Sequence, residues 1–495
     1  MRARTLGAAL LAALCLPGRC EVAASEPDAA HWQAMARKDL DAVRALVLEA
    51  HPVAIDPSNP HGRAWVDEGY EQALRHLPHV ISYDTAMAAV RSYVTGFEDV
   101  HFGYSDAARG DDPIWVTGWN IDWHDGRYVV VATVPDWPQT LPPVGAVWEG
   151  CDGQSAEEAL QAHVGPFVSR LGSDFGRRLR MATAWLRLPV EANFHECSFR
   201  LADGELVQLP VEYHQVTPEQ FFATIPRPQT GEVRGNGFEK QGDMLWIRAG
   251  NFDLAPDSQG LAALEEMLDG LEQVGDAKAI VFDMRGSTGG DSSIGGRIFE
   301  AATGGLEFDR SDMDALPRYF AQWRVSNPLI DFLDGRMAHV AALYGPDSSR
   351  LADERDFLDR LRKARDAGED WVVQDAGPSI TREEVQARGG HLRKPVGKVV
   401  LLTDGRCVSA CLDFADKVML VPGAIHVGQT TDADSIYMVG AEFPLPSGNW
   451  LVMPVKVWRN RVRGNNEPYV PDVEIDLSAD EAAIQREVRR SLGLD

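Results

Sequence analysis

The chain has 495 residues, 44% of them hydrophobic, and a chain of this length is expected to divide into two or three domains with buried cores. Its formal net charge is −26, from 74 acidic and 48 basic residues. This acidity argues against an extended contact with a nucleic-acid backbone or an anionic membrane surface.

Residues 1–24 have the composition of a secretory signal peptide. Arg2 and Arg4 precede an apolar run at 6–16, and small residues end the segment. The apolar run is too short to cross a bilayer, and no later segment is long and apolar enough to do so. We therefore expect a secreted or periplasmic protein with no integral membrane segment after signal cleavage.

Residues 25–110 are expected to form an N-terminal helical domain. Apolar residues recur there at spacings of three and four, which is the period of a helix that buries one face. Three segments show this pattern: DLDAVRALVLEAHP, WVDEGYEQALRHLP and TAMAAVRSYVTGF. His101 follows the third segment, so its place in the molecule depends on how this domain folds against the rest.

Residues 111–235 are expected to form a β-rich domain. From Trp115 the apolar residues follow the shorter period of strands, as in WVTGWNIDWHDGRYVVVATV. The segment IPRPQTGEVRGNG, at the end of this region, contains the proline and glycine typical of a linker.

Four cysteines remain once the signal is removed: Cys151, Cys197, Cys407 and Cys411. In an oxidising compartment they allow two disulfides. Cys151 with Cys197 is the first pair to test, because both lie in the β-rich domain. Cys407 and Cys411 are spaced by one helical turn, where a bridge would be strained, so we expect two small buried side chains there. A zinc site is not expected, because no Cys-x-x-Cys pair or histidine cluster accompanies them.

Residues 236–495 are expected to form an α/β core. Strand-like segments MLWIRAGNF, AKAIVFDMRG and GKVVLLTDG alternate with helix-like segments such as SQGLAALEEMLDGLEQV, which is typical of layered α/β folds. A charged, mainly helical segment at about 305–394 is expected to be an insertion into this core.

Two turns at strand ends could carry chemistry. Gly289 and Gly290 follow the strand AKAIVFDMRG, and glycines let backbone amides turn toward a ligand, as in an oxyanion hole. An ordinary glycine turn is the alternative, and a phosphate loop is disfavoured because no Gly-Lys-Ser/Thr follows. Ser409 follows the strand GKVVLLTDG at the start of a predicted helix, where it is either a nucleophile or simply the helix cap.

Several segments, in this order along the chain, resemble the carboxyl-terminal processing and tricorn-type serine proteases. FDMRGSTGG is similar to the Asp-Leu-Arg-x-Asn-x-Gly-Gly strand end of that family, VVLLTDGRCVSACLDFA to its nucleophile strand and helix, and IHVGQTT to the next strand. GFEDVHFGY resembles its Asp-x-His element, PVGAVWEGCDGQSAEEAL its PDZ-like domain, and EPYVPDVEID its closing segment. The resemblance implies a crotonase/ClpP-like β-β-α core, with the domain at 111–235 being PDZ-like.

The resemblance also implies the catalytic residues. Family members with a serine–lysine dyad carry the lysine shortly after the strand equivalent to IHVGQTT, but residues 431–435 contain no lysine, and neither Lys417 nor Lys456 matches that position. The base is therefore expected to be a histidine, as in the tricorn-like branch. The matching histidine is His101; Val100 stands where that branch has a second serine.

The candidate triad is Ser409 as nucleophile, His101 as base and Glu467 as the acid that orients His101. A serine hydroxyl needs an adjacent base at neutral pH, and an imidazole titrates in that range. The amides of Gly289, Gly290 and Ala410 are expected to bind the oxyanion. His426 is the rival base, although its apolar neighbours favour a buried structural histidine.

These features predict a secreted serine endopeptidase that needs no metal or organic cofactor. The expected partners are polypeptides, held by their C-terminal ends if the PDZ-like domain adds a peptide strand to its sheet. A catalytically inactive peptide- or ligand-binding protein on the same scaffold is the alternative. An esterase is a further one, although Ser409 has no Gly-x-Ser-x-Gly around it.

Overall fold

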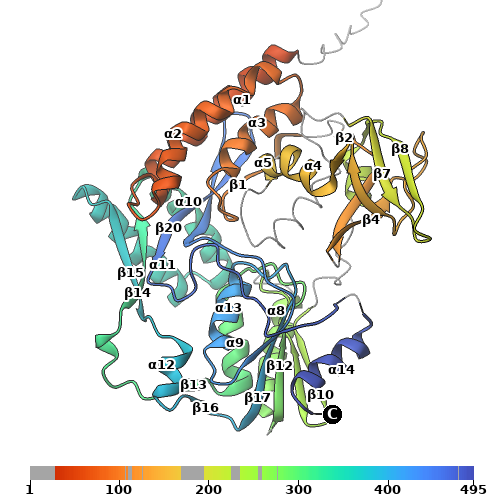
Figure 1. Cartoon of the computed structure of the whole chain (residues 1–495). Helices are drawn as coiled ribbons and strands as arrows, with labels where there is room; N and C mark the ends of the chain where they lie inside the picture. Colours follow the sequence, from red (N-terminus) through yellow and green to blue (C-terminus); the bar gives the residue numbers. More distant parts are fainter. Residues whose placement is uncertain are drawn as a thin grey trace, which may run out of the picture.

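A computed structural model of the chain describes most of the residues that follow the expected signal. The described residues are 28–105, 107–109, 114–124, 126–168, 194–224, 235–254, 259–275, 277–477 and 479–494. The expected signal and most of the expected linker at 225–237 lie outside the described residues. Figure 1 shows N-terminal helices, a β-rich unit beside them, and a layered sheet near the C-terminus.

Three helices occupy the N-terminal segments that have a helical period. They are α1 (Ala29–Ala50), α2 (Pro60–Leu74) and α3 (Tyr83–Thr95), with one-turn helices η1 (Pro52–Ala54) and η2 (Leu77–His79) between them. The side chains of Asp28, Asn59 and Ser82 each accept a hydrogen bond from an amide in the first turn of their helix. These caps satisfy amides that would otherwise lack acceptors, so local sequence sets the helix starts.

The N-terminal helices pack against an antiparallel sheet that contains late parts of the chain. Its strands are β1 (Gly103–Ser105), β14 (Arg318–Arg324), β15 (Trp371–Pro378), β19 (Tyr437–Pro444) and β20 (Trp450–Arg459). The order is β1-β20-β14-β15, and β19 also pairs with β20. Val43 of α1 and Tyr93 of α3 share one buried cluster with Leu451 and Val455 of β20. The N-terminal helices therefore fold back onto the C-terminal part of the chain.

The segment at about 305–394 contains strands as well as the expected helices. Its helices are α10 (Asn327–Tyr344), α11 (Ser349–Asp366) and α12 (Arg382–Ala387), with the one-turn η4 (Met313–Ala315). Besides β14 and β15 it contributes β13 (Leu306–Glu307) and β16 (His391–Leu392), which pair with each other. It thus builds part of the sheet on which the N-terminal helices pack.

A second sheet forms most of the β-rich unit. Its strands are β3 (Trp119–His124), β4 (Arg127–Thr133), β5 (Val147–Cys151), β7 (Glu196–Arg200) and β8 (Leu206–Pro210), in that order, with β6 (Gln154–Ser155) paired to β5. The remaining elements are η3 (Ala107–Arg109), β2 (Ile114–Val116), β9 (His214–Val216), α4 (Ala156–His163), α5 (Gly165–Val168) and α7 (Pro218–Thr224). A disulfide joins Cys151 and Cys197, which lie opposite each other on β5 and β7. This confirms the expected pairing.

The α/β core is built on a mainly parallel sheet, as the strand and helix alternation predicted. Its strands, in spatial order, are β10 (Gly237–Gln241), β11 (Met244–Arg248), β12 (Ala277–Asp283), β17 (Val396–Thr403), β18 (Ile425–Gly428) and β21 (Val473–Glu474). Its helices are α8 (Gln259–Gln273), α9 (Ser292–Thr303), α13 (Ala410–Met419) and α14 (Glu481–Ser491). Phe282 and Leu401 pack with the helices α8, α9 and α13, whereas Val281 and Val400 pack with α14. The alternation arises because successive strand side chains point to opposite faces.

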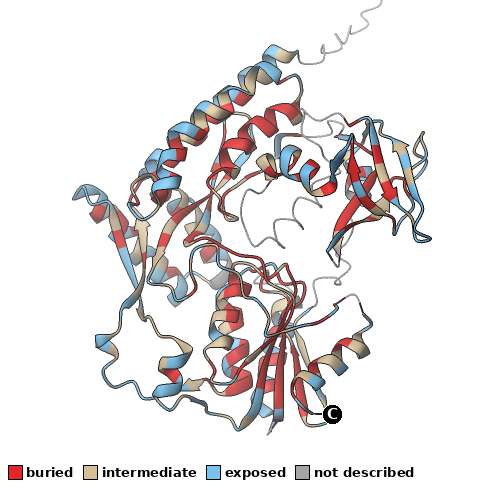
Figure 2. Ribbon diagram, in the orientation of Figure 1, coloured by how far each residue is buried: buried red, intermediate tan, exposed pale blue. Residues whose placement is uncertain are grey.

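Burial concentrates in the strands of this core and in the helix faces turned toward it (Figure 2). Helices therefore cover both faces of the parallel sheet, which is the usual arrangement for such sheets. Among the residues that the structure describes, no helix is long and apolar enough to cross a membrane.

Candidate active site

The two candidate turns meet at one edge of the core sheet. β12 and β17 are parallel neighbours, so the turns that follow them leave the sheet at the same edge. The Gly286 amide donates a 2.9 Å hydrogen bond to Asp404 Oδ2, which ties the two turns together. A methyl group added at Gly289 would lie 2.9 Å from Ser409 Cβ and 3.2 Å from the Ala410 nitrogen. Only glycine leaves room for this approach.

Ser409 has a strained backbone that a simple helix cap does not require. Its φ is 58° and its ψ is −125°, a region that residues with a side chain rarely adopt and that costs about 1–3 kcal/mol. Ser409 occupies the N-cap position of α13, but its side chain makes no capping hydrogen bond, so capping does not account for the serine. A serine on a sharp, strained turn between a strand and a helix is the geometry of a nucleophile elbow. Ser409 is also partly exposed, so its hydroxyl is within reach of a substrate.

Three backbone amides beside Ser409 have no hydrogen-bond acceptor among the described residues. They belong to Gly289, Gly290 and Ala410, the residues expected to bind an oxyanion. Gly289 and Gly290 have φ values of 104° and 121°, which glycine adopts readily. A methyl group at Gly290 would come within 2.3 Å of the Phe252 carbonyl. Gly289 and Gly290 therefore have conformations that only glycine can adopt at these positions.

His101 is held between the N-terminal helices and the antiparallel sheet. It follows α3 and precedes β1, which pairs with β20 through Gly103 and Val452. Its Nδ1 lies 3.5 Å from Asp99 Oδ1, and its side chain is 16% exposed against 1% for Asp99. The same Asp99 oxygen accepts a 2.8 Å hydrogen bond from the His101 amide. Both ring nitrogens are buried and make no hydrogen bond within the described part of the chain, so the contact with Asp99 is an ion pair at 3.5 Å.

Charges on three carboxylates act on His101. Burial lowers the pKa of His101, but the adjacent Asp99, together with Asp434 and Asp413, raises it above its usual value. Asp413 lies in the first turns of α13, four residues after Ser409, and it is partly buried, with the Ser292 hydroxyl donating a 2.6 Å hydrogen bond to it. The carboxylates that raise the pKa of His101 therefore come from three parts of the chain: Asp99 before β1, Asp413 in α13 and Asp434 in the loop after β18.

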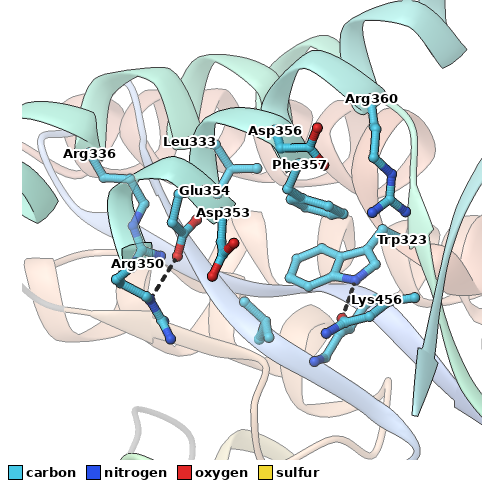
Figure 3. Close-up of a pocket in the computed structure, with 12 residues that line it drawn as sticks. Trp323, Leu333, Arg336, Arg350, Asp353, Glu354, Asp356, Phe357, Arg360 and Lys456 are labelled. Carbon is cyan, nitrogen blue, oxygen red and sulfur yellow. Dashed lines mark hydrogen bonds and ion pairs between the residues drawn. The ribbon is translucent and has the colours of Figure 1, made fainter. Parts of the chain in front are cut away.

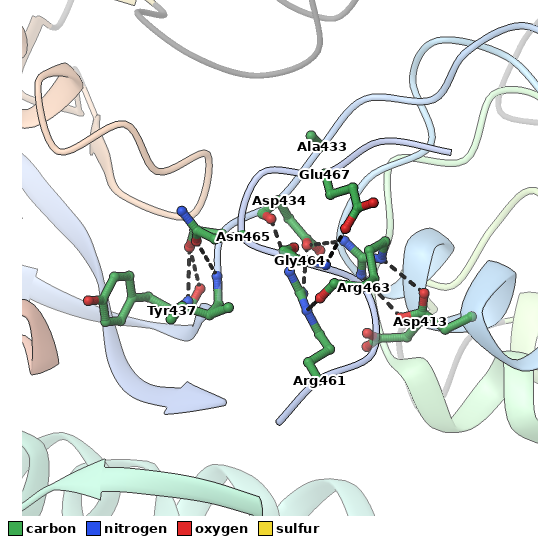
Figure 4. A network of polar contacts seen from close by, with 12 residues as sticks. Asp413, Ala433, Asp434, Tyr437, Arg461, Arg463, Gly464, Asn465 and Glu467 are labelled. Carbon is green, nitrogen blue, oxygen red and sulfur yellow. Dashed lines mark hydrogen bonds and ion pairs between the residues drawn. The ribbon is translucent and has the colours of Figure 1, made fainter. Parts of the chain in front are cut away.

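Glu467, the expected acid, lies in a loop next to the His101 segment but binds another group. The Asn466 side chain donates a 3.0 Å hydrogen bond to the Glu98 carbonyl, which links the two segments. The Glu467 carboxylate is exposed and accepts a 2.5 Å hydrogen bond from the Gly464 amide (Figure 4). The carboxylate beside His101 is that of Asp99. Sequence reasoning overlooked Asp99 as a partner, although the Asp-x-His spacing offered that signal.

A buried ion-pair network fills the stretch where a dyad lysine would be expected. Asp434 is fully buried and accepts hydrogen bonds of 2.8 Å from Arg461 and 2.5 Å from Arg463 (Figure 4). Arg463 also donates a 2.9 Å bond to Asp416 of α13, and the Tyr469 hydroxyl donates a 2.7 Å bond to the same atom. The network thus anchors residues 431–435 to α13 through arginines.

The rival base, His426, has the surroundings expected for a structural histidine. It is 1% exposed, on β18 within the core sheet. Its Nε2 lies 2.7 Å from the Thr403 hydroxyl, and burial lowers its pKa. These contacts hold the His426 side chain against Thr403 of the neighbouring strand β17.

A groove of about 470 Å³ lies between α10, α11 and the antiparallel sheet (Figure 3). Lys456 lines it, with its Nζ 4.9 Å from the Trp323 ring centre and 4.5 Å from that of Trp458. Burial lowers the pKa of Lys456 to about 8. None of the proposed site residues lines this groove.

The expectation of unbridged thiols at Cys407 and Cys411 is wrong. Both cysteines are fully buried, as expected, but they form a disulfide. The expectation treated their spacing of four residues as one helical turn, whereas α13 begins only at Ala410 and Cys407 lies in the turn before it. The turn brings the two Cα atoms to 5.2 Å, which is within the usual range for a disulfide.

Comparison with models of protein families gives no match, and comparison with curated proteins gives none either. Solved structures do match. The crystal structure of mature CPAF aligns with a TM-score of 0.61 at 11% identity, covering 93% of this chain and 97% of that chain. Mature CPAF complexed with lactacystin gives 0.59 at 12% identity, covering 93% and 98%.

The photosystem II D1 C-terminal processing protease covers 90% of this chain and 93% of its own at 13% identity, but its TM-score of 0.36 is too low to carry an argument. The structural matches therefore show that this chain shares the fold of mature CPAF over most of its length.

Proposed function

We propose that the protein is a secreted serine endopeptidase whose nucleophile is Ser409. The observation that carries the proposal is the strained turn at Ser409, with its unbonded side chain and with Gly289 packed directly against it. Strain of this kind persists only where the surroundings impose it, and it is common at catalytic nucleophiles.

The proposed reaction is acyl transfer through a covalent intermediate. Ser409 attacks the carbonyl carbon of a peptide bond while His101 Nε2 takes the hydroxyl proton and then delivers it to the leaving amine. The amides of Gly289, Gly290 and Ala410 stabilise the oxyanion, which forms where these free donors converge. Water, activated by the same histidine, then hydrolyses the acyl-enzyme.

Two carboxylates are candidates for orienting His101. Asp99 is supported by its 3.5 Å ion pair with Nδ1, and Glu467 by the sequence resemblance. We propose that Asp99 holds the imidazole in the conformation described here, because the Glu467 carboxylate is bound to the Gly464 amide. The two assignments differ in the pH dependence that they predict for variants.

Polypeptides are the proposed substrates. The motif resemblance to carboxyl-terminal processing and tricorn-type proteases supports this, as does the fold shared with mature CPAF. In the β-rich unit, β8 ends the order of its sheet, so a peptide could add to that edge as another strand. Two disulfides in the described part of the chain support an oxidising compartment and hence secretion.

A fluorophosphonate probe tests the nucleophile. We expect labelling of the wild-type protein, no labelling of Ser409→Ala, and unchanged labelling of Ser311→Ala, which alters an exposed serine elsewhere. Labelling that survives Ser409→Ala would show that the nucleophile assignment is wrong. An unlabelled wild-type protein that binds denatured polypeptides would support the non-catalytic alternative. Ester turnover without cleavage of denatured proteins would instead support an esterase.

A further inference from the structure

One of the two disulfides encloses the proposed nucleophile. Cys407 and Cys411 stand two residues before and two residues after Ser409, so the serine is the central residue of the bridged segment. Both cysteines are fully buried, and their Cα atoms are 5.2 Å apart. The bridge therefore fixes the separation of the two ends of the turn that carries Ser409.

The Ser409 carbonyl accepts hydrogen bonds of 2.8 Å and 3.1 Å from the Leu412 and Asp413 amides, which hold the start of α13 but not the chain that enters the turn. The Ser409 side chain does not cap α13. The Cys407 amide donates a long 3.4 Å hydrogen bond to the Asp404 carbonyl, and the Cys411 amide a 3.2 Å bond to the Val408 carbonyl. Without the disulfide, the turn is free to relax and Ser409 to take a negative φ, since residues with a side chain prefer that region.

Relaxation of this turn would displace two catalytic groups together. Ser409 Cβ and the Ala410 amide both lie against Gly289, as the short distances from a methyl group placed there demonstrate. A change of φ at Ser409 rotates its side chain relative to the Ala410 amide. A misplacement of about 1 Å can cost on the order of a hundredfold in rate.

We propose that the Cys407–Cys411 disulfide is a positioning element, which holds Ser409 in the strained turn and keeps its hydroxyl aligned with the oxyanion donors. This inference rests on the proposed function of Ser409. It makes the rate of acylation, rather than the binding of substrate, depend on the oxidation state of one buried disulfide.

The chain supplies its own control in the Cys151–Cys197 disulfide. That bridge joins β5 and β7 inside the hydrophobic core of the β-rich unit, which contains none of the proposed catalytic residues. Removing it tests the general effect of losing a disulfide. Removing the Cys407–Cys411 bridge tests that effect together with the loss of positioning.

The experiment compares Cys407→Ala/Cys411→Ala with Cys151→Ala/Cys197→Ala in the full-length mature protein. Because Cys407 and Cys411 are buried, alanine keeps these positions apolar. We expect the first double variant to lose on the order of ten- to a hundredfold in kcat and in the rate of fluorophosphonate labelling, with KM changed by about twofold or less. The control variant should keep its labelling rate within about twofold.

Reduction of the wild-type protein supplies a second perturbation, which does not require any variant to fold. Tris(2-carboxyethyl)phosphine gives two electrons to the disulfide, each sulfur takes up one proton, and the phosphine becomes its oxide with an oxygen atom from water. Labelling of the wild-type protein should fall on reduction and recover on reoxidation. The Cys407→Ala/Cys411→Ala variant should not respond, whereas the control variant, which retains the bridge around Ser409, should respond as the wild type does.

Amide hydrogen exchange separates this inference from the proposed function. Faster exchange at residues 408–413 in the Cys407→Ala/Cys411→Ala variant is expected whether or not Ser409 is catalytic. Wild-type exchange and wild-type labelling in that folded variant would overturn the positioning role alone. Failure of the wild-type protein to label at Ser409 would overturn the proposed function, and the exchange result would then decide only whether the bridge orders the turn.

Discussion

Gly289 is the glycine that packs directly against the proposed nucleophile. A methyl group there would lie 2.9 Å from Ser409 Cβ, and its φ of 104° disfavours any side chain. The proposed oxyanion donor and the nucleophile would therefore both move if this residue became larger. The contact explains why a glycine is needed at this strand end, which the sequence pattern alone did not distinguish from an ordinary glycine turn.

We predict that Gly289→Ala lowers kcat about a hundredfold or more, since loss of one oxyanion donor has effects of that size. Gly242→Ala is the matched control, because Gly242 also has a positive φ, 65°, but open space around it. Both substitutions place a side chain on a residue with positive φ, which is unfavourable, so both variants should lose stability in denaturant titrations. Equal peptidase activity of the two variants would contradict the placement of Gly289 in the site.

The imidazole of His101 offers a pH test of its acidic partner. Burial lowers its pKa, but Asp99 is the main group that raises it above the usual value. The base must be unprotonated to act, so kcat/KM is expected to rise with pH through this raised pKa. Asp99→Asn should shift that acidic limb to lower pH and lower the maximum about tenfold or more.

Glu467→Gln is the comparison for this prediction. If Asp99 is the partner, the acidic limb of kcat/KM for Glu467→Gln should stay where it is in the wild type. A shift in Glu467→Gln with none in Asp99→Asn would reverse the assignment and restore the acid expected from the sequence resemblance. The pH profile is needed because either change alone could lower activity through a loss of structure.

At the level of elements, the hairpin of β19 and β20 connects the N-terminal helices with the sheet. Asn449, at the end of that hairpin, is 1% exposed and joins three groups. Its Oδ1 accepts hydrogen bonds from the Tyr83 hydroxyl of α3 and from the Ala108 amide, each 2.9 Å long. Its Nδ2 donates a 2.9 Å bond to the Tyr104 hydroxyl of β1. One side chain therefore fixes the segments on either side of His101.

We predict that Asn449→Ala lowers the free energy of unfolding by about 1–3 kcal/mol, because it leaves buried donors and acceptors unpaired. Since His101 lies between α3 and β1, the variant should also label more slowly under conditions where it remains folded. Urea titration and probe kinetics measure the two effects. Slow labelling is not expected for Ser311→Ala, and a normal labelling rate in folded Asn449→Ala would show that this contact does not position His101.

The strands of the 305–394 segment were not predicted from the local sequence. The period of α10 and α11 is local, so the helices were expected. β14 and β15 acquire their strand partners from each other and, for β14, from β20, more than a hundred residues away. Most residues of β15 are exposed or half-buried, so no strong apolar alternation marks it. Long-range pairing, rather than local propensity, decides such strands.

At the level of the whole molecule, the proposed site exists only because distant parts of the chain are docked together. An ion pair contributes to that docking: Arg459 at the end of β20 lies 3.0 Å from Asp56, which follows η1 and is fully buried. Burial raises the pKa of Asp56, but hydrogen bonds from Arg459 and Ser58 hold it below its usual value. Ionised Asp56 therefore stabilises the folded chain.

The sign of the pH effect follows from that pKa. A carboxyl group whose pKa is lower when folded contributes stability above its unfolded pKa, and this contribution is lost as the pH falls through its folded pKa. We predict that Asp56→Asn destabilises the protein at neutral pH by about 3 kcal/mol, because it leaves a partly buried arginine without its charge partner. The difference from wild type should shrink below about pH 4. Thermal unfolding across pH measures it, and a constant difference would contradict the prediction.

The local sequence was sufficient to predict the N-terminal helices, the alternation of the α/β core and the two turns that hold Gly289 and Ser409. Those features depend on periodicity, on capping residues and on glycine, all of which act over a few residues. The same local information misjudged Cys407, because it treated the spacing of the two cysteines as one helical turn, whereas Cys407 lies in the turn before α13.

Only the tertiary structure decided what these elements do together. It left the Ser409 side chain without a capping hydrogen bond, packed Gly289 against that serine, and placed Asp99 rather than Glu467 beside His101. The physical reason is that the N-terminal helices bury their apolar faces against β19 and β20, which come late in the chain. That burial, which no local pattern specifies, joins the segment that carries His101 to the C-terminal part of the chain.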